Sequence, residues 1–257
     1  MTDNREELKE YQARLWGLIP TERITRFKIE RPSPALVAAY RELDEPTPTI
    51  ADVLDSLGIN GIVAASVLKP VVPGKTAVGP AVTMRYLLER NSVTQSFVEQ
   101  ATPKLADRDA HAVAEPGDIV VVDAGGAEVS CMGGLSTTVA SAKGLAGSVI
   151  YGGVRDVATM RAKGFPVWSA HVTPRSGKYR LEAAEINGPI TVAGVQVRPG
   201  DLVAADDTGI VFVPLERAEE VLRRVQETVA KEQRIIDMLA GGATIEEMRR
   251  VLPPSKW

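Results

Sequence analysis

The feature that most constrains this sequence is a regular alternation of short apolar runs and helix-forming segments, punctuated by glycine, over residues 115–170. Three apolar runs alternate with two helix-forming segments: 119–122, 135–143, 148–151, 157–163 and 166–170. The β-branched run at 119–122 is typical of a strand buried on both faces. Strands that alternate with helices pair in parallel through right-handed crossovers. We therefore predict an α/β fold.

The segments before this alternation predict helices and then strands. Residues 1–45 form a helical N-terminal extension, in which Ser33 caps a helix over 34–43 with Pro34 as its first residue. Thr49 caps a second short helix, and Gly58 ends it. Strand-like runs follow at 64–68 and 77–86.

The segments after the alternation predict short strands and a terminal helix. Four runs split by glycine and proline predict strands: 190–192, 195–197, 202–205 and 210–213. A charged amphipathic helix is expected over 215–239. No linker is evident, so we predict a single domain over residues 1–257, with a C-terminal helical segment at 215–257.

The net charge and the cysteine content limit which binding partners and which cell compartment we expect. The formal net charge is −3, with no polybasic stretch, so we expect neither a nucleic-acid nor a membrane partner. Cys131 is the single cysteine, which suits a reducing compartment. No apolar run reaches the length of a membrane helix, and residues 1–10 are polar, so we expect a cytoplasmic protein.

Several common catalytic signatures are absent from the sequence. It contains no Walker loop, no GxGxxG after a strand, no cysteine pair and no HExxH. The two histidines, His111 and His171, leave little choice for a Ser-His-Asp triad. Chemistry must therefore come from other segments.

The first candidate segment is Gly133-Gly134-Leu135-Ser136-Thr137, at the end of a loop predicted over 125–134. Glycines here run directly into a helix start, where free backbone N–H groups suit a carboxylate or phosphate. Ser136 or Thr137 caps the helix in this interpretation. The alternative is a plain tight turn.

The second candidate segment is Gly152-Gly153-Val154-Arg155-Asp156, which follows a predicted buried strand. Ligands of open α/β sheets bind at this edge. Arg155 offers a planar fork for a carboxylate, and Asp156 offers a hard oxygen ligand for Mg²⁺ or a similar cation. The alternative is a surface ion pair that caps the next helix.

Other polar residues are weaker candidates. Asp123 follows a strand at the same expected edge, Asp206 and Asp207 lie in a predicted turn, and His171 follows a strand. Cys131 has no evident catalytic partner. Three arginines are interpreted as surface or interface charges: Arg85, Arg108 and Arg175.

Together these segments resemble the family of the regulator of ribonuclease activity A and the 4-hydroxy-4-methyl-2-oxoglutarate/4-carboxy-4-hydroxy-2-oxoadipate aldolases. The most specific part is Tyr-Gly-Gly-Val-Arg-Asp at 151–156, spaced as it is after Gly-Gly-Leu at 133–135. Further similar stretches are 49–58, 116–122, 132–140, 147–156, 164–169 and 197–214.

The resemblance implies a swivelling β/β/α fold of the phosphohistidine-domain type, assembled as a homotrimer or a dimer of trimers. It implies that Asp156 holds a divalent metal, Mg²⁺ or Mn²⁺, largely through water. It implies that Arg155 binds a 2-oxo acid and that amides of residues 133–136, including Gly133, Gly134, Leu135 and Ser136, hold its carboxylate. Such enzymes form pyruvate by aldol cleavage and also decarboxylate oxaloacetate.

One position departs from that family. Many of its aldolases carry an acid where this chain has Gly134, and that acid contacts metal-bound water. Glu232, on the C-terminal helix, is a candidate carboxylate from a neighbouring subunit.

Three functions follow as hypotheses. The first is a metal-dependent lyase, an aldolase or decarboxylase, acting on a small 2-oxo acid such as 4-hydroxy-4-methyl-2-oxoglutarate or oxaloacetate. The second is another enzyme of the same scaffold that acts on a hydroxy or sugar acid. The third is a non-enzymatic binding protein of the ribonuclease-regulator kind.

Overall fold

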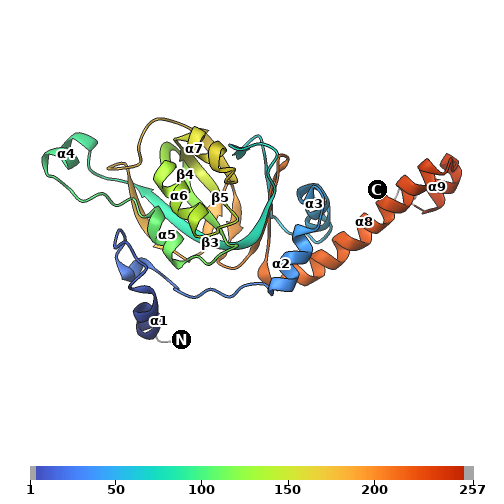
Figure 1. The fold of residues 1–257 in the computed structure, drawn as a ribbon, viewed down its shortest axis with the longest axis horizontal. Coiled ribbons are helices and arrows are strands. Elements are labelled where there is room, and N and C mark those ends of the chain that lie inside the picture. The colour runs from blue at the N-terminus through green and yellow to red at the C-terminus, as the bar shows by residue number, and fades with distance from the viewer. Residues whose placement is uncertain (1–3, 252–257) are drawn as a thin grey trace.

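The computed structural model describes residues 4–251 of the 257-residue chain. Its helices are α1 (Asn4–Tyr11), α2 (Pro34–Arg41), α3 (Pro46–Ser56), α4 (Val93–Val98), α5 (Asp107–Val113), α6 (Gly134–Ala142), α7 (Val157–Lys163), α8 (Ala218–Ala240) and α9 (Ile245–Val251), with short 3₁₀ turns at Thr21–Arg23 and Leu215–Arg217. Its strands are β1 (Ile62–Ala64), β2 (Lys69–Pro70), β3 (Ala77–Leu88), β4 (Ile119–Met132), β5 (Gly147–Val154), β6 (Val167–Val172), β7 (Leu181–Ile186), β8 (Ile190–Val192), β9 (Val195–Val197), β10 (Leu202–Ala205) and β11 (Gly209–Val213). The predicted α/β class is confirmed (Figure 1).

The long strand β3 joins a parallel half and an antiparallel half of one sheet. Within residues 4–251 this sheet has nine strands in the order β1-β11-β10-β3-β4-β5-β6-β2, and β7 pairs with β3 beside that path. The first residues of β3 pair with β10 in antiparallel, and Ala81 to Arg85 pair with β4 in parallel. The pairs β4–β5 and β5–β6 are also parallel, as the alternation at 115–170 predicts.

Both faces of the parallel half are buried, which explains its continuous apolar sequence. Successive side chains of a strand point to opposite faces, so Val120 and Val122 pack toward α5, α6 and α7. Ile119 and Val121 pack on the other face with Trp168, β8 and β9. A third cluster joins α2, α3 and α8 to β10 and β11. The resulting layers place α5–α7 and α2–α3–α8 on different sides of the strands (Figure 1).

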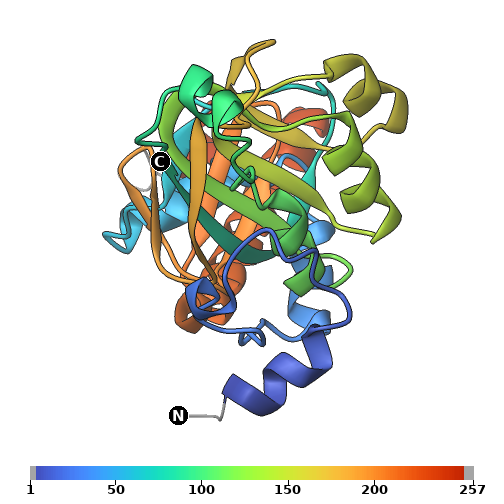
Figure 2. The same cartoon turned by 90° about the vertical axis from the view of Figure 1, so that its left-hand side faces the viewer.

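The N-terminal extension is anchored to the body by buried carboxylates. The Asp109 side chain, on α5, is fully buried and accepts the backbone N–H groups of residues 16–19. Arg31 donates through two nitrogens to Asp118, at 3.0 and 2.7 Å. Figure 2 shows the extension crossing the face of the molecule beside α5. It is less helical than predicted, since an extended chain separates α1 from α2.

The helix boundaries mostly follow their sequence signals. Ser33 accepts the N–H of Leu36 at the start of α2, and Gly58 has a φ of +65° just after α3, as expected. However, α3 begins at Pro46, ahead of the predicted cap Thr49. Helix α7 has the predicted bounds, and Gly164 ends it at φ +59°. The short elements α4, α5 and β7 were not predicted.

The predicted glycine-rich loop over 125–134 is wrong, because β4 continues to Met132. Its pairing with β5 shifts register between Asp123 and Ala127 and twice more before Met132. Gly125 and Gly126 adopt φ of +60° and +71°, a conformation that glycine allows in a bulge. The predicted strand at 64–68 is also displaced, since β1 ends at Ala64 and a turn follows.

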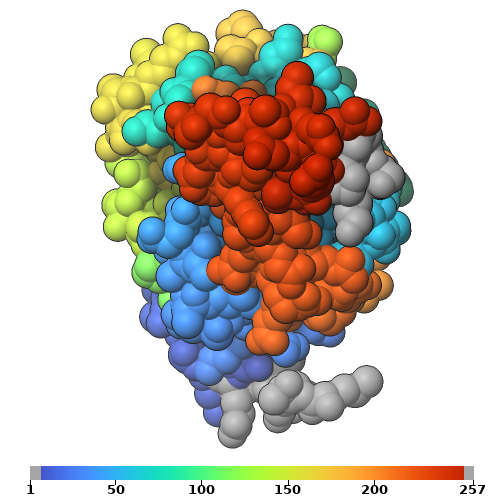
Figure 3. Space-filling model, turned by 90° about the vertical axis from the view of Figure 1, so that its right-hand side faces the viewer, coloured from blue at the N-terminus to red at the C-terminus, as the bar shows by residue number. Residues whose placement is uncertain are grey.

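The C-terminal helices extend from the body as an arm (Figure 1). Figure 3 shows α8 and α9 beside the helices of the α2–α3 region. The first turns of α8 are buried through Val221 and Val225, but Val229, Ile236 and Leu239 are exposed. Homotrimer or hexamer formation stays a prediction. Among the described residues, no helix is both long and apolar enough to cross a membrane.

Candidate active site

The two predicted segments meet where β4 and β5 end. These strands are parallel and adjacent, so their carboxyl ends share one edge of the sheet. Beyond Met132 the chain enters α6, and beyond Val154 it enters α7. The Arg155 N–H donates to the Met132 carbonyl at 3.0 Å, which ties the two connections together. Residues 133–136 and Arg155-Asp156 are therefore neighbours.

Asp156 points across this junction toward α6. Its backbone is left-handed, with φ 56° and ψ 41°, an uncommon conformation for a residue other than glycine. Its side chain makes no capping bond to α7, so the alternative interpretation holds only for the surface ion pair with Arg155 and not for the cap. Instead the Oδ2 atom accepts the Gly134 N–H at 2.8 Å.

Arg155 and Asp156 face the same space. The distance from Arg155 Nε to Asp156 Oδ2 is 3.7 Å, and the two side chains are 45% and 49% exposed. An ion pair this exposed contributes little to stability, with a typical value of about 0–1 kcal/mol. Ligand binding is therefore a better explanation for the position of these two side chains than stabilisation of the fold.

Gly133 allows these two side chains to come close. A Cβ atom at Gly133 would lie 2.8 Å from Asp156 Oδ2 and 3.1 Å from Arg155 Nε. Gly134 is less restricted, since a Cβ there would lie 3.2 Å from Thr159 Oγ1 and 3.4 Å from Asp156 Oδ2. A side chain at position 133 would therefore have to displace Asp156 or Arg155, whereas one at position 134 would need a smaller shift of Thr159.

A cavity of about 200 Å³ opens at this junction. Its walls include both predicted segments and the start of α5, through Asp107, Arg108, Gly134, Ser136, Arg155 and Asp156. The N–H groups of Leu135 and Ser136 belong to the first turn of α6, which has no intrahelical acceptor for them. Together with Arg155 they could bind an anion such as a carboxylate.

Asp107 is a site candidate that the sequence analysis missed. It lies in the first turn of α5 and is only 9% exposed. Burial raises the pKa of this carboxyl, while the nearby Ser136 hydroxyl and the Arg108 guanidinium act in the opposite direction. The Ser136 Oγ atom is itself buried, and its hydroxyl is close enough to Asp107 to act on that carboxyl. A buried acid beside a buried hydroxyl on one cavity is typical of a functional site.

Comparison with known proteins gives the family. The chain matches the RraA-like family, described as Aldolase/RraA, over residues 47–212. It belongs to this family. A putative 4-hydroxy-4-methyl-2-oxoglutarate aldolase of Halalkalibacterium halodurans is 32% identical over 79% of this chain and 91% of that protein. Protein DlpA of Legionella pneumophila is also 32% identical, over 78% of this chain but only 31% of its own length.

A solved structure agrees with the family assignment. The crystal structure of Streptomyces coelicolor RraAS2, an unusual member of the RNase ES inhibitor RraA protein family, has a TM-score of 0.68 and 29% identity to this chain. The match covers 80% of this RraA-like chain and 98% of RraAS2. The fold implied by the family resemblance is thereby confirmed.

The donor set of this RraA-like site suits a hard divalent cation. Within the described residues no group of three His, Cys, Asp or Glu side chains is placed to hold a metal ion. Mg²⁺ commonly binds through one or two carboxylates and keeps several waters. Asp156, with Asp107 on the same cavity, fits that requirement, so Asp156 would hold the ion and water would complete its shell.

The single cysteine and the two histidines are not suited to chemistry at this cavity. Cys131 lines the cavity, but burial raises the pKa of its thiol to about 12, so it stays protonated and unreactive. Burial lowers the pKa of His111 to about 3, so this side chain stays neutral. His171 contacts the Gly126 carbonyl at 3.0 Å and lines a different cavity.

Asp206 and Asp207 lie in the predicted turn, between β10 and β11, whereas Asp123 lies within β4. Asp206 accepts hydrogen bonds from Thr47 and Thr208, and Asp207 accepts the Gly74 N–H. Asp123 accepts the N–H groups of Gly125 and Thr191. None of the three lines the cavity at Asp156.

The arginines interpreted as surface charges divide into two groups. Arg85 pairs with Glu185 on the surface at 3.0 Å, and Arg175 is exposed, as expected. Arg108 differs, because it lines the cavity at Asp156. Arg108 is partly exposed, so its interpretation as a surface or interface charge stays open, but it also lines this cavity.

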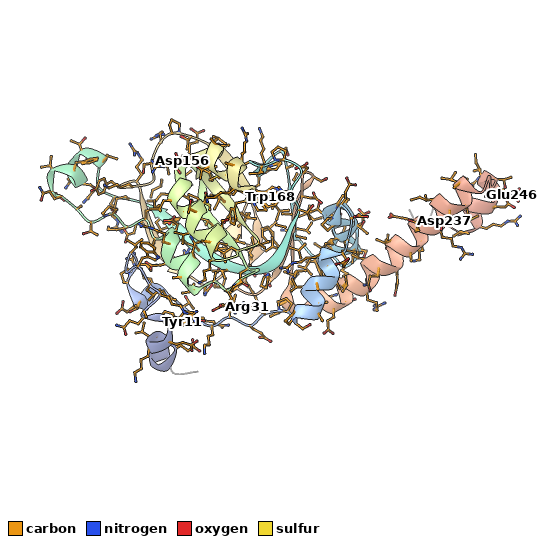
Figure 4. All side chains as sticks on the ribbon, in the orientation of Figure 1. Tyr11, Arg31, Asp156, Trp168, Asp237 and Glu246 are labelled. Atoms are coloured by element: carbon orange, nitrogen blue, oxygen red, sulfur yellow. The ribbon has the colours of Figure 1, made fainter. Side chains whose placement is uncertain are left out.

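Glu232 is exposed on α8 and does not line this cavity within one protomer. Figure 4 shows Asp237 of the same helix far along the C-terminal arm from Asp156. A role for Glu232 in the site of a neighbouring subunit therefore stays a prediction.

Proposed function

We propose that this RraA-like protein is a divalent-metal-dependent lyase that breaks a carbon–carbon bond in a small 2-oxo acid, as an aldolase, a decarboxylase or both. The observation that carries the proposal is the single cavity shared by Arg155, Asp156, the first turn of α6 and Asp107. The relatives named as putative aldolases support the same class of reaction.

Substrate binding follows from the positive groups. The Leu135 and Ser136 N–H groups and the Arg155 guanidinium would hold the carboxylate next to the 2-oxo group. This orientation would place the 2-oxo oxygen toward Asp156. A Mg²⁺ or Mn²⁺ ion bound through Asp156 would supply the positive charge that stabilises negative charge developing on that oxygen.

Asp107 would accept the proton from the substrate and later return it. In aldol cleavage, its carboxylate accepts the proton of the 4-hydroxyl group while the C3–C4 bond breaks. The hydroxyl carbon becomes a carbonyl, and the bonding electrons pass to the enolate of pyruvate. The proton then returns to the enolate carbon. In decarboxylation, CO₂ leaves and only this last proton transfer is needed. A carboxyl whose pKa is raised by burial suits both directions of transfer.

Turnover of purified full-length protein tests the proposal. Pyruvate release from oxaloacetate and from 4-hydroxy-4-methyl-2-oxoglutarate is measured with Mg²⁺, with Mn²⁺ and with a chelator, each against a protein-free control. We expect metal-dependent release above that control. Turnover of hydroxy or sugar acids alone would instead indicate another enzyme of this scaffold, and complete inactivity would indicate a binding protein.

Replacing Arg155 connects that activity to the cavity. For Arg155→Gln we expect KM for the 2-oxo acid to rise about 10- to 100-fold, because a charged hydrogen-bonding partner of the carboxylate is lost. Arg161→Gln is a matched control, since Arg161 lies on α7 and lines a different cavity. An equal KM in both variants would remove Arg155 from the substrate site.

A further inference from the structure

Arg108 brings a second arginine to the wall of the candidate active site, from an element outside the predicted motifs. It follows Asp107 on α5 and lines the same cavity as Arg155. It takes part in none of the ion pairs formed by the described side chains. Its guanidinium acts on the pKa of the buried Asp107 carboxyl beside it, and it can also bind a ligand anion in the cavity.

The N-terminal extension holds the Arg108 side chain. The Arg108 Cζ atom lies 4.7 Å from the centroid of the Trp16 ring, in a cation–π contact. Trp16 and Arg108 also line a second, adjacent cavity together. Stacking on a ring restricts a guanidinium without neutralising its charge.

Trp16 is in turn fixed by the residue that follows Arg108. The buried Asp109 carboxylate accepts the N–H groups of Trp16 and Gly17 on Oδ1, and those of Leu18 and Ile19 on Oδ2. Four N–H groups on one carboxylate fix the backbone of residues 16–19 against α5. The extension is thus a structural part of the cavity wall that carries Arg108.

The positive groups then lie at separate places around a small cavity. Arg155 and the first turn of α6 form one anion-binding surface, and Arg108 on α5 forms another. We propose that Arg108, positioned by Trp16, binds the distal carboxylate of a 2-oxo diacid, so that the protein selects dicarboxylates over monocarboxylates. This inference rests on the proposed function only in placing the 2-oxo carboxylate at Arg155.

Binding of unreactive probes to the full-length protein tests the inference. Calorimetric titration with 2-oxoglutarate, a diacid, is compared with titration by 2-oxobutyrate, a monoacid, in the presence of Mg²⁺. We expect the wild-type protein to prefer the diacid. In Arg108→Gln, we expect 2-oxoglutarate affinity to fall about 10-fold or more and 2-oxobutyrate affinity to stay unchanged.

Two further substitutions separate positioning from folding. Trp16→Ala should reduce the diacid preference in the same direction, and Trp16→Phe should restore most of it, because either aromatic ring can support the guanidinium. Arg14→Gln is the matched control. Arg14 stacks on Tyr11 at 5.1 Å and lines the adjacent cavity but not the one at Asp156. It should keep the full preference.

The outcomes distinguish this inference from the proposed function. A wild-type protein without diacid preference, or an Arg108→Gln variant that weakens both probes equally, would overturn the inference even if lyase activity is found. A diacid preference that depends on Arg108 would support the inference even if no carbon–carbon bond is cleaved. Thermal melting of each variant shows that the compared proteins are folded.

Discussion

Two pairs of an acid and an arginine, each adjacent in the sequence, line the same cavity, and they differ in how deeply the fold buries them. Arg155-Asp156 lies between β5 and α7, where both side chains are about half exposed. Asp107-Arg108 lies in the first turn of α5, where the acid is buried and the arginine stacks on Trp16. Each pair therefore presents a carboxyl group and a guanidinium to the cavity, but in a different environment.

The difference in burial assigns different roles to the two acids. Asp156 is accessible to water and accepts one N–H, which suits a carboxylate that holds a hydrated cation. Burial raises the pKa of Asp107, which suits a group that gains and loses a proton. When two acids in one site have such different environments, they commonly have different roles in catalysis.

The largest effect is expected for Asp156→Asn. Asparagine can still accept the Gly134 N–H and tolerates a left-handed backbone, but its neutral amide is a poor ligand for Mg²⁺. We expect metal-stimulated kcat to fall about 1,000-fold, since charge stabilisation by a metal is worth several kcal/mol. The melting temperature should stay close to that of the wild type. Retention of metal-dependent turnover would exclude Asp156 as the ligand.

A smaller loss, about 100-fold in kcat/KM, is expected for Asp107→Asn if this group transfers the proton. For the wild type acting on 4-hydroxy-4-methyl-2-oxoglutarate, kcat/KM should rise with pH through the raised pKa of Asp107, because aldol cleavage needs its carboxylate form. The variant should lack that rise. A pH profile with the same rise in both proteins would assign the proton to another group.

The same substitution has a consequence for stability, with a defined sign. Because the pKa of Asp107 is raised above 3.8 in the folded protein, the folded state holds this proton more tightly than the unfolded state. The contribution of Asp107 to stability is fully present below pH 3.8 and is lost as pH rises through its raised pKa. At neutral pH, Asp107→Asn should therefore melt at a higher temperature than the wild type, as is common when a functional residue is removed. This advantage should vanish below pH 3.8.

The contrast also explains why one pair could be predicted from the sequence and the other could not. Arg155-Asp156 follows two glycines at the end of an apolar run, and the position of such a run in a parallel sheet is a local signal. Asp107 and Arg108 lie in a short charged segment that has no periodic pattern. Their place on the cavity depends on the packing of α5 and on the four N–H groups that bind residues 16–19 to Asp109.

The same limit applies to β4. Its β-branched start was predicted, whereas its extension to Met132 depends on glycines that adopt positive φ inside a strand. Glycine-rich sequence indicates a loop and a bulged strand equally well. Only the pairing of residues 127–132 with β5 distinguishes them.

The smallest effect is expected from a pair of glycine variants that alter only the Arg155-Asp156 side of the comparison. Gly133 has an ordinary φ of −136°, so Gly133→Ala strains no backbone, but its methyl group would displace Asp156 Oδ2 and Arg155 Nε. We expect about a 10-fold loss of kcat/KM, since displacement of a group by about 1 Å can cost up to 100-fold. Gly134→Ala, whose methyl group meets its nearest atom at 3.2 Å, should retain most activity. Equal activity of the two variants would show that close packing of Arg155 and Asp156 against residue 133 is unimportant. The functional difference between the two pairs would then depend on Asp107 and Arg108 alone.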